Sequence, residues 1–233
     1  MTIEKILSKI DLVVTDVGGV LIKTDEAIIS CIQRVVMEQG IPDGSLDSIY
    51  TVFGVSLKEY IKAYLPDGYK DRTDECYRNF KKVYPATVLH VLKPFEGVDE
   101  TLDHLKRVGI RVAVLSCMLQ TEVETSLSLL KFRAFDAVFS LEDYGEDHTR
   151  PDPDGLRKLI AKLGCTKGRT IYVGDSESDV LMGRNAGVIS IAVKSGVQPK
   201  DYIARAQPDF TVDSFRDIVR IIDIIGSGIR DCP

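Results

Sequence analysis

The sequence predicts an α/β fold in which a doubly wound parallel sheet carries an inserted α-helical domain. Short apolar runs rich in Val and Ile alternate with stretches of helical periodicity along most of the chain. This alternation is typical of βαβ units. One long segment in the first half of the chain contains helical patterns alone, which indicates that a helical domain is inserted there.

Five apolar runs have the length and composition of buried parallel strands. They are residues 12–15, 111–115, 137–139, 170–173 and 188–193. Between these runs, apolar side chains recur every three or four positions, as in Val98, Leu102 and Leu105. This spacing places the side chains on one face of a helix, so each intervening segment is predicted to cover the sheet.

The inserted segment runs from about residue 24 to about residue 92 and has three helical stripes, which include Cys31, Tyr60 and Phe80. The turn-forming sequences GIPDGS and LPDGYKDRTD separate the stripes. We therefore expect a core domain of residues 1–22 and 93–233 and a helical domain of residues 23–92. A domain inserted beside the crevice of the sheet is suited to act as a lid that excludes water.

Composition excludes several classes of partner. The 233 residues carry 30 basic and 35 acidic side chains, for a net charge of −5, and no long basic run. We therefore expect neither a nucleic acid nor a membrane as partner. Five cysteines without a CxxC pair argue against a disulfide framework and a zinc site, and the N-terminal segment MTIEKILSKIDLVV lacks the apolar core of a signal peptide. These features favour a cytoplasmic location, and nothing in the sequence indicates an oligomeric state.

Polar residues follow three of the predicted strands. Asp16 comes after the first strand, Ser116 after the second and Asp175 at the end of the fourth. The carboxyl ends of parallel strands border the ligand crevice of an open α/β sheet, so we expect these groups to converge. Asp175 and Asp179, in the segment GDSESD, offer the oxygen ligands that Mg²⁺ prefers. The alternative is that Asp175 and Ser176 only cap the next helix.

Two further groups are candidates for binding an anion. Ser116 and the neighbouring Cys117 offer a hydroxyl group and a backbone N–H, although a serine at the end of a strand is more often a cap or turn residue. Arg150 precedes a proline that holds it out of the next helix, and its guanidinium group has the shape to grip phosphate oxygens. An exposed loop arginine is the alternative for this position.

Taken together, an Asp on the first strand, a Ser on the second, a cation before PDP and then GDSESD resemble the ordered motifs of the haloacid dehalogenase-like hydrolase superfamily. The segments KPFEGVDETLDHLKRVGIRVAVLS, RPDPDGLRKLIAKLG and IYVGDSESDVLMGRNAGV look most like phosphoglycolate phosphatase-type members with a helical cap domain. The resemblance covers roughly the whole chain. It implies a Rossmann-like core, a helical cap and Mg²⁺-dependent hydrolysis of a small phosphorylated metabolite of the phosphoglycolate or sugar-phosphate type.

The resemblance also implies roles at individual positions. Asp16 matches the nucleophile that attacks phosphorus and forms an aspartyl-phosphate. Asp175 matches the carboxylate that holds Mg²⁺ together with Asp16 and the backbone carbonyl of Gly18, and Asp179 matches an acidic position that supports these ligands. Arg150 stands where the family usually has Lys, and would neutralise the phosphate and the nucleophile.

The remaining positions concern the substrate. Ser116 matches the phosphate-binding Ser or Thr of the family, with Cys117 and Gly19 beside it as further candidates. In this type of cap, the loop between the first two helices points into the site, and here it spans residues 52–59. Lys58 in this loop could pair with a second anionic group of the substrate, although helix-surface lysines are usually just solvated.

The first motif departs from the usual D-x-D-G-T of the family, because here it reads DVGGV. Gly18 replaces the Asp that protonates the leaving alcohol, and Val20 replaces the Thr. General acid–base help is worth about 10²- to 10⁴-fold, so an unassisted alkoxide is expected to leave slowly. Some members, including sugar-phosphate phosphatases, carry a similar D-x-G-G-V-L motif. Asp25 and His148 are the nearest candidates in sequence for a general acid in place of the missing Asp. The alternative, which is the more common one for such residues, is that both are ordinary surface groups.

Two functions of different classes remain open at this point. The first is a Mg²⁺-dependent phosphatase that acts through Asp16. The second is a catalytically silent relative that binds a phosphorylated ligand or a protein partner on the same scaffold, since a fold does not fix a function. A dehalogenase is disfavoured, because GDSESD resembles the metal-holding form of the motif.

Overall fold

The structure is a computed structural model that describes residues 10–52, 54, 56–88, 91–145 and 148–227. Its core is a six-stranded sheet in the order β5-β4-β1-β6-β7-β8, and every neighbouring pair is parallel. The strands are β1 (Leu12–Thr15), β4 (Arg111–Leu115), β5 (Ala137–Phe139), β6 (Thr170–Gly174), β7 (Ile189–Val193) and β8 (Phe210–Val212). The predicted fold class is confirmed.

Five of the six strands lie where the apolar runs predicted them, with ends that differ by one residue at β6 and at β7. The sixth, β8, was not predicted. It has only three residues, and Thr211 in its centre is exposed at the edge of the sheet beside β7. A short edge strand with one solvent-facing side lacks the continuous apolar run that identifies a buried strand.

Helices cover both faces of the sheet. On one face, Val13 belongs to the same apolar cluster as α5 (Val98–Arg107), α6 (Gln120–Ser128) and α11 (Ile218–Ser227). On the other face, Leu12 and Val14 pack with α7 (Leu141–Tyr144), α8 (Asp154–Lys162) and α9 (Glu177–Ala186). Successive side chains of a strand point to opposite faces, so β1 joins the two layers. A further helix, α10 (Lys200–Arg205), packs on α9.

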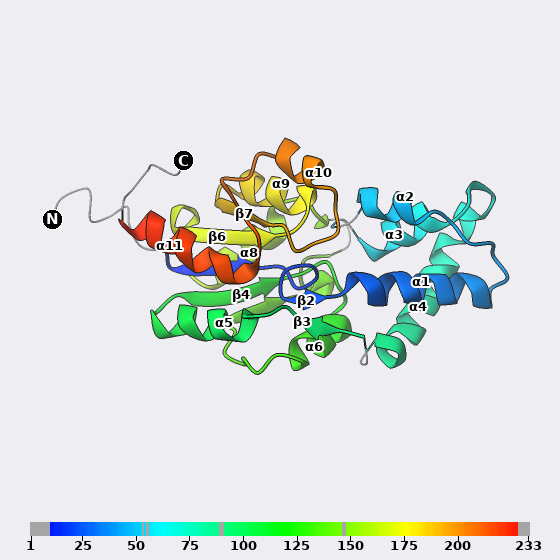
Figure 1. Cartoon of the computed structure of the whole chain (residues 1–233), viewed down its shortest axis with the longest axis horizontal. Helices are drawn as coiled ribbons and strands as arrows, with labels where there is room; N and C mark the ends of the chain where they lie inside the picture. The colour runs from blue at the N-terminus through cyan, green and yellow to red at the C-terminus, as the bar shows by residue number, and fades with distance from the viewer. Residues whose placement is uncertain (1–9, 53, 55, 89–90, 146–147, 228–233) are drawn as a thin grey trace.

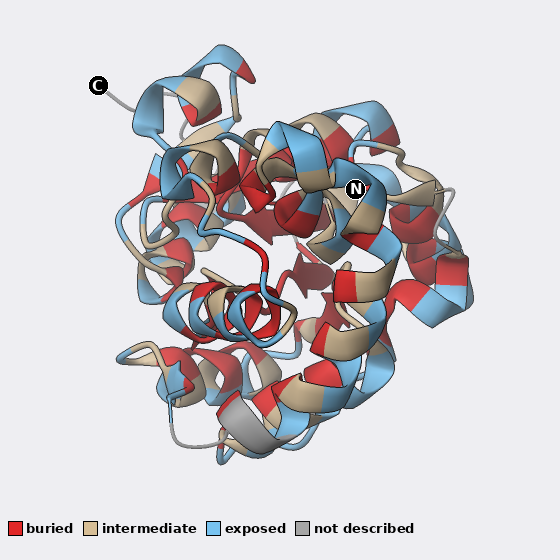
Figure 2. Ribbon diagram, turned by 90° about the vertical axis from the view of Figure 1, so that its right-hand side faces the viewer, coloured by how far each residue is buried: buried red, intermediate tan, exposed pale blue. Residues whose placement is uncertain are grey.

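In its described residues, the inserted segment forms four α-helices that pack on one another. They are α1 (Asp25–Glu38), α2 (Leu46–Val52), α3 (Leu57–Tyr64) and α4 (Thr73–Val88). Figure 1 shows these helices at one end of the molecule and the sheet with its flanking helices at the other. Seen from that end, in Figure 2, the buried strands lie behind outer helices whose exposed faces turn outward.

A two-stranded antiparallel ribbon joins the inserted helices to the core. Its strands are β2 (Ile22–Lys23), which leads out of the core, and β3 (Lys93–Pro94), which leads back. The ribbon places the segment that leaves the core beside the segment that returns to it. This arrangement supports the proposed domain boundaries near residues 22 and 93. No helix in the described part of the chain is long and apolar enough to cross a membrane.

Candidate active site

The carboxyl ends of three central strands deliver polar side chains into one cavity. Asp16 follows β1, Ser116 follows β4 and Asp175 follows β6, and all three line one cavity. Residues of α1, α3 and α4 line the same cavity, so it lies between the sheet and the inserted helices. The convergence expected from the strand ends is therefore present in the structure.

The loop after β1 turns sharply around Gly18. Gly19 N–H donates to the Ile22 carbonyl at 2.9 Å, and Ile22 N–H donates to the Val17 carbonyl at 2.9 Å. Neither bond uses the Gly18 carbonyl. Asp16 itself is held at the sheet, because its N–H donates to the Val173 carbonyl of β6 at 3.0 Å.

The guanidinium group of Arg150 lies between two carboxylates. Its Nη2 is 2.7 Å from Asp16 Oδ1 and its Nη1 is 2.9 Å from Asp179 Oδ1. The Arg150 side chain is only 4% exposed, so the alternative of an exposed loop arginine is excluded. Burial works against its charge, but Asp16 and Asp179 outweigh burial and raise the pKa of Arg150 well above its usual value.

Asp179 has protein partners on both of its oxygens. Its Oδ1 accepts a hydrogen bond from the Tyr172 hydroxyl at 2.8 Å, in addition to the ion pair with Arg150. Its Oδ2 accepts from Ser176 Oγ at 2.6 Å and from Ser176 N–H at 3.2 Å. Ser176 is the N-cap of α9 and forms its capping box with Asp179, so the capping alternative holds for Ser176 but not for Asp175. The same contacts fix the loop that carries Asp175. Sequence reasoning missed Tyr172, which is hidden in an apolar strand.

Asp175 faces the cavity, and the backbone wraps closely around its carboxylate. A Cβ atom built on Gly19 or on Gly196 would lie 2.0 or 1.9 Å from Asp175 Oδ2, so only glycine fits at these two positions. Ser195 Oγ donates to the Gly19 carbonyl at 2.6 Å and ties the two loops together. Burial, and then the neighbouring carboxylates Asp179 and Asp16, raise the pKa of Asp175 well above its usual value.

This donor set fits a divalent cation. Oxygens of Asp16, Asp175 and Asp179 lie within 4.8 Å of one another, and all three residues are buried. The three carboxylates face one cationic group, the guanidinium of Arg150. A bound cation would offset the repulsion among them that Arg150 leaves. Asp16 Oδ1 contacts Arg150 without hydrogen-bond geometry and has no other partner among the described residues. Hard oxygen donors in this arrangement suit a hard cation.

Ser116 and Cys117 both line the cavity, as the anion-binding prediction requires. Ser116 is 1% exposed, and its N–H donates to the Phe139 carbonyl of β5 at 3.0 Å. Its carbonyl accepts from the Tyr144 hydroxyl at 2.9 Å, and the same hydroxyl lies 3.3 Å from Cys117 Sγ. The Ser116 hydroxyl is therefore on a rigid strand end beside Asp16.

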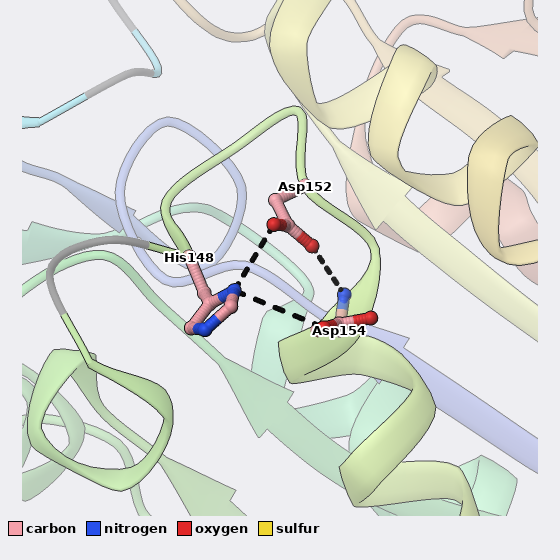
Figure 3. A group of neighbouring side chains, drawn as sticks. All are labelled: His148, Asp152 and Asp154. Carbon is pink, nitrogen blue, oxygen red and sulfur yellow. Dashed lines mark hydrogen bonds and ion pairs between the residues drawn. The ribbon is translucent and has the colours of Figure 1, made fainter.

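The two candidates for a substitute acid lie in different places. Asp25, in the first turn of α1, lines the cavity together with Asp16 and Gly18. His148 is not among the described residues that line it. Figure 3 shows His148 beside two other side chains, with its Nδ1 3.1 Å from Asp152 Oδ2 and 3.8 Å from Asp154 Oδ2. The hydrogen bond from Asp154 N–H and the contact with His148 lower the pKa of Asp152.

Lys58 lies beside the main cavity and not in its described lining. It lines a second hollow that shares Ser56, Leu57, Cys117 and Glu122 with the first, and its Nζ is 2.6 Å from the Asp74 carboxylate. The structure therefore does not bring Lys58 into the main cavity with the described residues that line it. Phe53 and Val55 of the same loop lie outside the described residues.

Gly54 connects the inserted helices to the core. Its carbonyl accepts from Ser178 Oγ at 2.8 Å and from Arg150 Nη1 at 3.5 Å, and its N–H donates to the Tyr60 hydroxyl of α3 at 2.7 Å. Gly54 has a φ of +92°, and a Cβ atom on it would lie 2.0 Å from Ser176 Oγ. Sequence reasoning placed this loop near the site but did not single out Gly54.

The sequence profile of the haloacid dehalogenase-like hydrolase family matches residues 13–193. Pyrophosphatase PpaX of Halalkalibacterium halodurans is 30% identical to this chain over 219 residues, which cover 93% of this chain and 98% of that protein. Pyrophosphatase PpaX of Bacillus cereus is 27% identical over 215 residues, which cover 92% of this chain and 97% of that protein. These matches support a phosphatase activity.

Solved structures with the same fold include a haloacid dehalogenase-like hydrolase of Bacteroides fragilis. It has a TM-score of 0.81 and 23% identity, and the match covers 90% of this chain and 100% of that one. A predicted phosphoglycolate phosphatase of Haemophilus somnus has a TM-score of 0.80 and 22% identity, covering 92% of this chain and 99% of that one. The family profile spans most of the chain and includes the three strand ends that line the cavity. The chain therefore belongs to the haloacid dehalogenase-like hydrolase family.

Proposed function

We propose that this protein is a Mg²⁺-dependent phosphatase that hydrolyses a small phosphorylated metabolite through an aspartyl-phosphate on Asp16. The observation that carries the proposal is the position of Asp16: a buried carboxylate, paired with Arg150, at the strand end that opens into the cavity. The names of the relatives, pyrophosphatase and phosphoglycolate phosphatase, support hydrolysis of a phosphate bond.

In the first step, a carboxylate oxygen of Asp16 attacks phosphorus and the bond from phosphorus to the leaving oxygen breaks. The leaving oxygen takes the electron pair of that bond and then a proton. In the second step, water attacks the phosphorus of the aspartyl-phosphate, which releases inorganic phosphate and restores the carboxylate. Splitting the displacement in this way replaces one difficult step by two easier ones.

Asp16, the Gly18 carbonyl and Asp175 would hold Mg²⁺, and the bound cation would supply positive charge to the phosphate oxygens. Asp179 supports these ligands, because its hydrogen bonds hold the loop of Asp175 and its ion pair holds Arg150. Ser116, the Cys117 backbone and Gly19 line the space for the transferred phosphate, and Arg150 neutralises charge on Asp16. The free thiols of Cys31, Cys76, Cys117 and Cys165 suit the proposed cytoplasmic location.

A catalytically silent protein that binds a phosphorylated ligand is the second candidate. The observation that favours it is Gly18, which has no side chain to protonate the leaving group. Asp25 weakens this alternative, because it brings a carboxyl group into the cavity that Gly18 also lines. We propose Asp25 as the group that handles the proton.

Asp16→Asn tests the nucleophile. Wild-type protein is expected to hydrolyse 4-nitrophenyl phosphate when Mg²⁺ is present and to stop when the metal is chelated, and Asp16→Asn is expected to abolish turnover because an amide does not attack phosphorus. The measurement is release of inorganic phosphate, with circular dichroism to show that the variant is folded. Absence of turnover by the wild type on any phosphate ester would refute the phosphatase proposal.

Asp25→Asn tests the source of the proton. With an alkyl phosphate, whose leaving group needs a proton, kcat should fall by about 10²-fold or more, whereas an aryl phosphate should be affected much less. Glu26→Gln is the matched control, since Glu26 is the exposed neighbour in the same first turn of α1. Equal losses on both classes of ester would contradict the role of Asp25.

Gly54→Ala tests whether closure of the inserted helices excludes water from the site. The added Cβ would collide with Ser176 Oγ, so the helices would no longer close on the core, and kcat/KM should fall by about tenfold or more. Gly40→Ala is the control: Gly40 also has a positive φ, of +66°, but no atom lies within 4 Å of its added Cβ. Similar losses in both variants would show that backbone strain alone, and not closure, explains the effect.

A further inference from the structure

A pair of buried polar groups in the cavity takes no part in the chemistry described above. Glu122 on α6 and Tyr84 on α4 both line the cavity that holds Asp16, and they are 6% and 1% exposed. Glu122 Oε1 and the Tyr84 hydroxyl have no hydrogen-bond partner among the described residues. An unpaired buried polar group costs about 1–3 kcal/mol, so a pair of them in one cavity suggests that a ligand supplies the partners.

The other carboxylate oxygen of Glu122, Oε2, has a structural role. Glu122 Oε2 accepts from Leu119 N–H at 2.9 Å and caps the start of α6. This contact explains how the side chain is oriented, but it uses one oxygen only. Burial raises the pKa of Glu122 to about 7, so near neutral pH its carboxyl group exists in both accepting and donating forms.

The charge of the cavity restricts what the ligand can carry there. Arg150 is the one cationic side chain among the described residues that line it, and Asp16 and Asp179 already contact its guanidinium. Asp25 and Glu122 add further carboxyl groups, and the remaining walls include Ile28, Leu57, Phe80 and Met118. Apart from Arg150, the described lining of the cavity offers an anionic group next to Glu122 no cationic side chain, whereas a hydroxyl or ammonium group would find two acceptors there.

We propose that Glu122 and Tyr84 form the subsite for the leaving group of the substrate, and that this leaving group is an organic group with hydrogen-bond donors and without a second anion. The inference rests on the proposed phosphatase function and narrows it. It separates this protein from an enzyme for pyrophosphate or phosphoglycolate, whose leaving groups are anionic. Hydroxyl and ammonium groups share the donor chemistry that the subsite recognises.

The test compares phosphate esters of similar size: propyl phosphate without a donor, glycerol phosphate with hydroxyl donors, aminopropyl phosphate with an ammonium donor, and phosphoglycerate and pyrophosphate with a second anion. The wild type should prefer glycerol or aminopropyl phosphate to propyl phosphate by about tenfold in kcat/KM, and should use the two anionic esters least. A higher rate with glycerol phosphate identifies hydroxyl groups as the natural donors, and a higher rate with aminopropyl phosphate identifies an ammonium group.

Glu122→Gln and Tyr84→Phe should both reduce this preference toward unity. Glu122→Gln keeps an oxygen that can cap α6 and nearly the same shape. Tyr84→Phe removes a hydroxyl that has no partner in the described part of the protein, so this second variant remains informative if the first is unstable. Ser126→Ala is the matched control. Ser126 Oγ is also buried on α6 without a partner, but Ser126 is absent from the described lining of the cavity, so the preference should not change.

Turnover of 4-nitrophenyl phosphate distinguishes failure of the proposed subsite from failure of the proposed phosphatase function. If the wild type hydrolyses it but shows no preference for donor-bearing esters, or if Glu122→Gln and Tyr84→Phe leave the preference intact, the subsite is refuted while the phosphatase proposal stands. Efficient use of pyrophosphate or phosphoglycerate would also overturn the subsite. If no ester is hydrolysed, the proposed function fails and the inference fails with it.

Discussion

The ion pairs of Arg150 with Asp16 and Asp179 are the interaction on which the rest of the site depends. Three buried carboxylates at one edge of a sheet repel one another, and removing a buried partner charge typically costs about 3–5 kcal/mol. A guanidinium group contacts Asp16 through Nη2 and Asp179 through Nη1, so one side chain bridges the end of β1 and the first turn of α9. The point charge of a lysine has no such fork. Arginine at this position therefore supplies a positive charge with two points of attachment.

That bridge also links the core to the inserted helices. The Gly54 carbonyl lies against Arg150 and Ser178, and Tyr60 of α3 holds the Gly54 N–H, so the position of the inserted helices depends on the same guanidinium group. The cavity has Asp16, Ser116 and Asp175 at the sheet and the Glu122–Tyr84 pair on the side of α4 and α6. In our proposal, the chemistry and the choice of substrate therefore come from different elements that meet only in the folded chain.

The sequence predicted those features that are encoded locally. Apolar runs identify five strands because parallel strands are buried on both faces. The convergence of Asp16, Ser116 and Asp175 on one cavity could be predicted because they end such runs. The edge strand β8 was missed because it is short and half exposed. Tyr172, Gly54, Tyr84 and Glu122 were missed for a different reason. Gly54 contacts Arg150 and Ser178, which are far away in the sequence, and Tyr84 and Glu122 line one cavity although they lie on different helices. Tyr172 lies inside an apolar strand. Periodicity carries no information about such contacts.

Direct detection of a phosphoryl group on Asp16 tests the central claim. Wild-type protein with Mg²⁺ and a phosphate ester would be quenched in acid during turnover and digested, and its peptides analysed by mass spectrometry. We predict a phosphorylated peptide that contains Asp16 and that is absent from Asp16→Asn. Phosphate turnover by the wild type with no modified Asp16 peptide, or a phosphoryl group on another residue, would contradict the account.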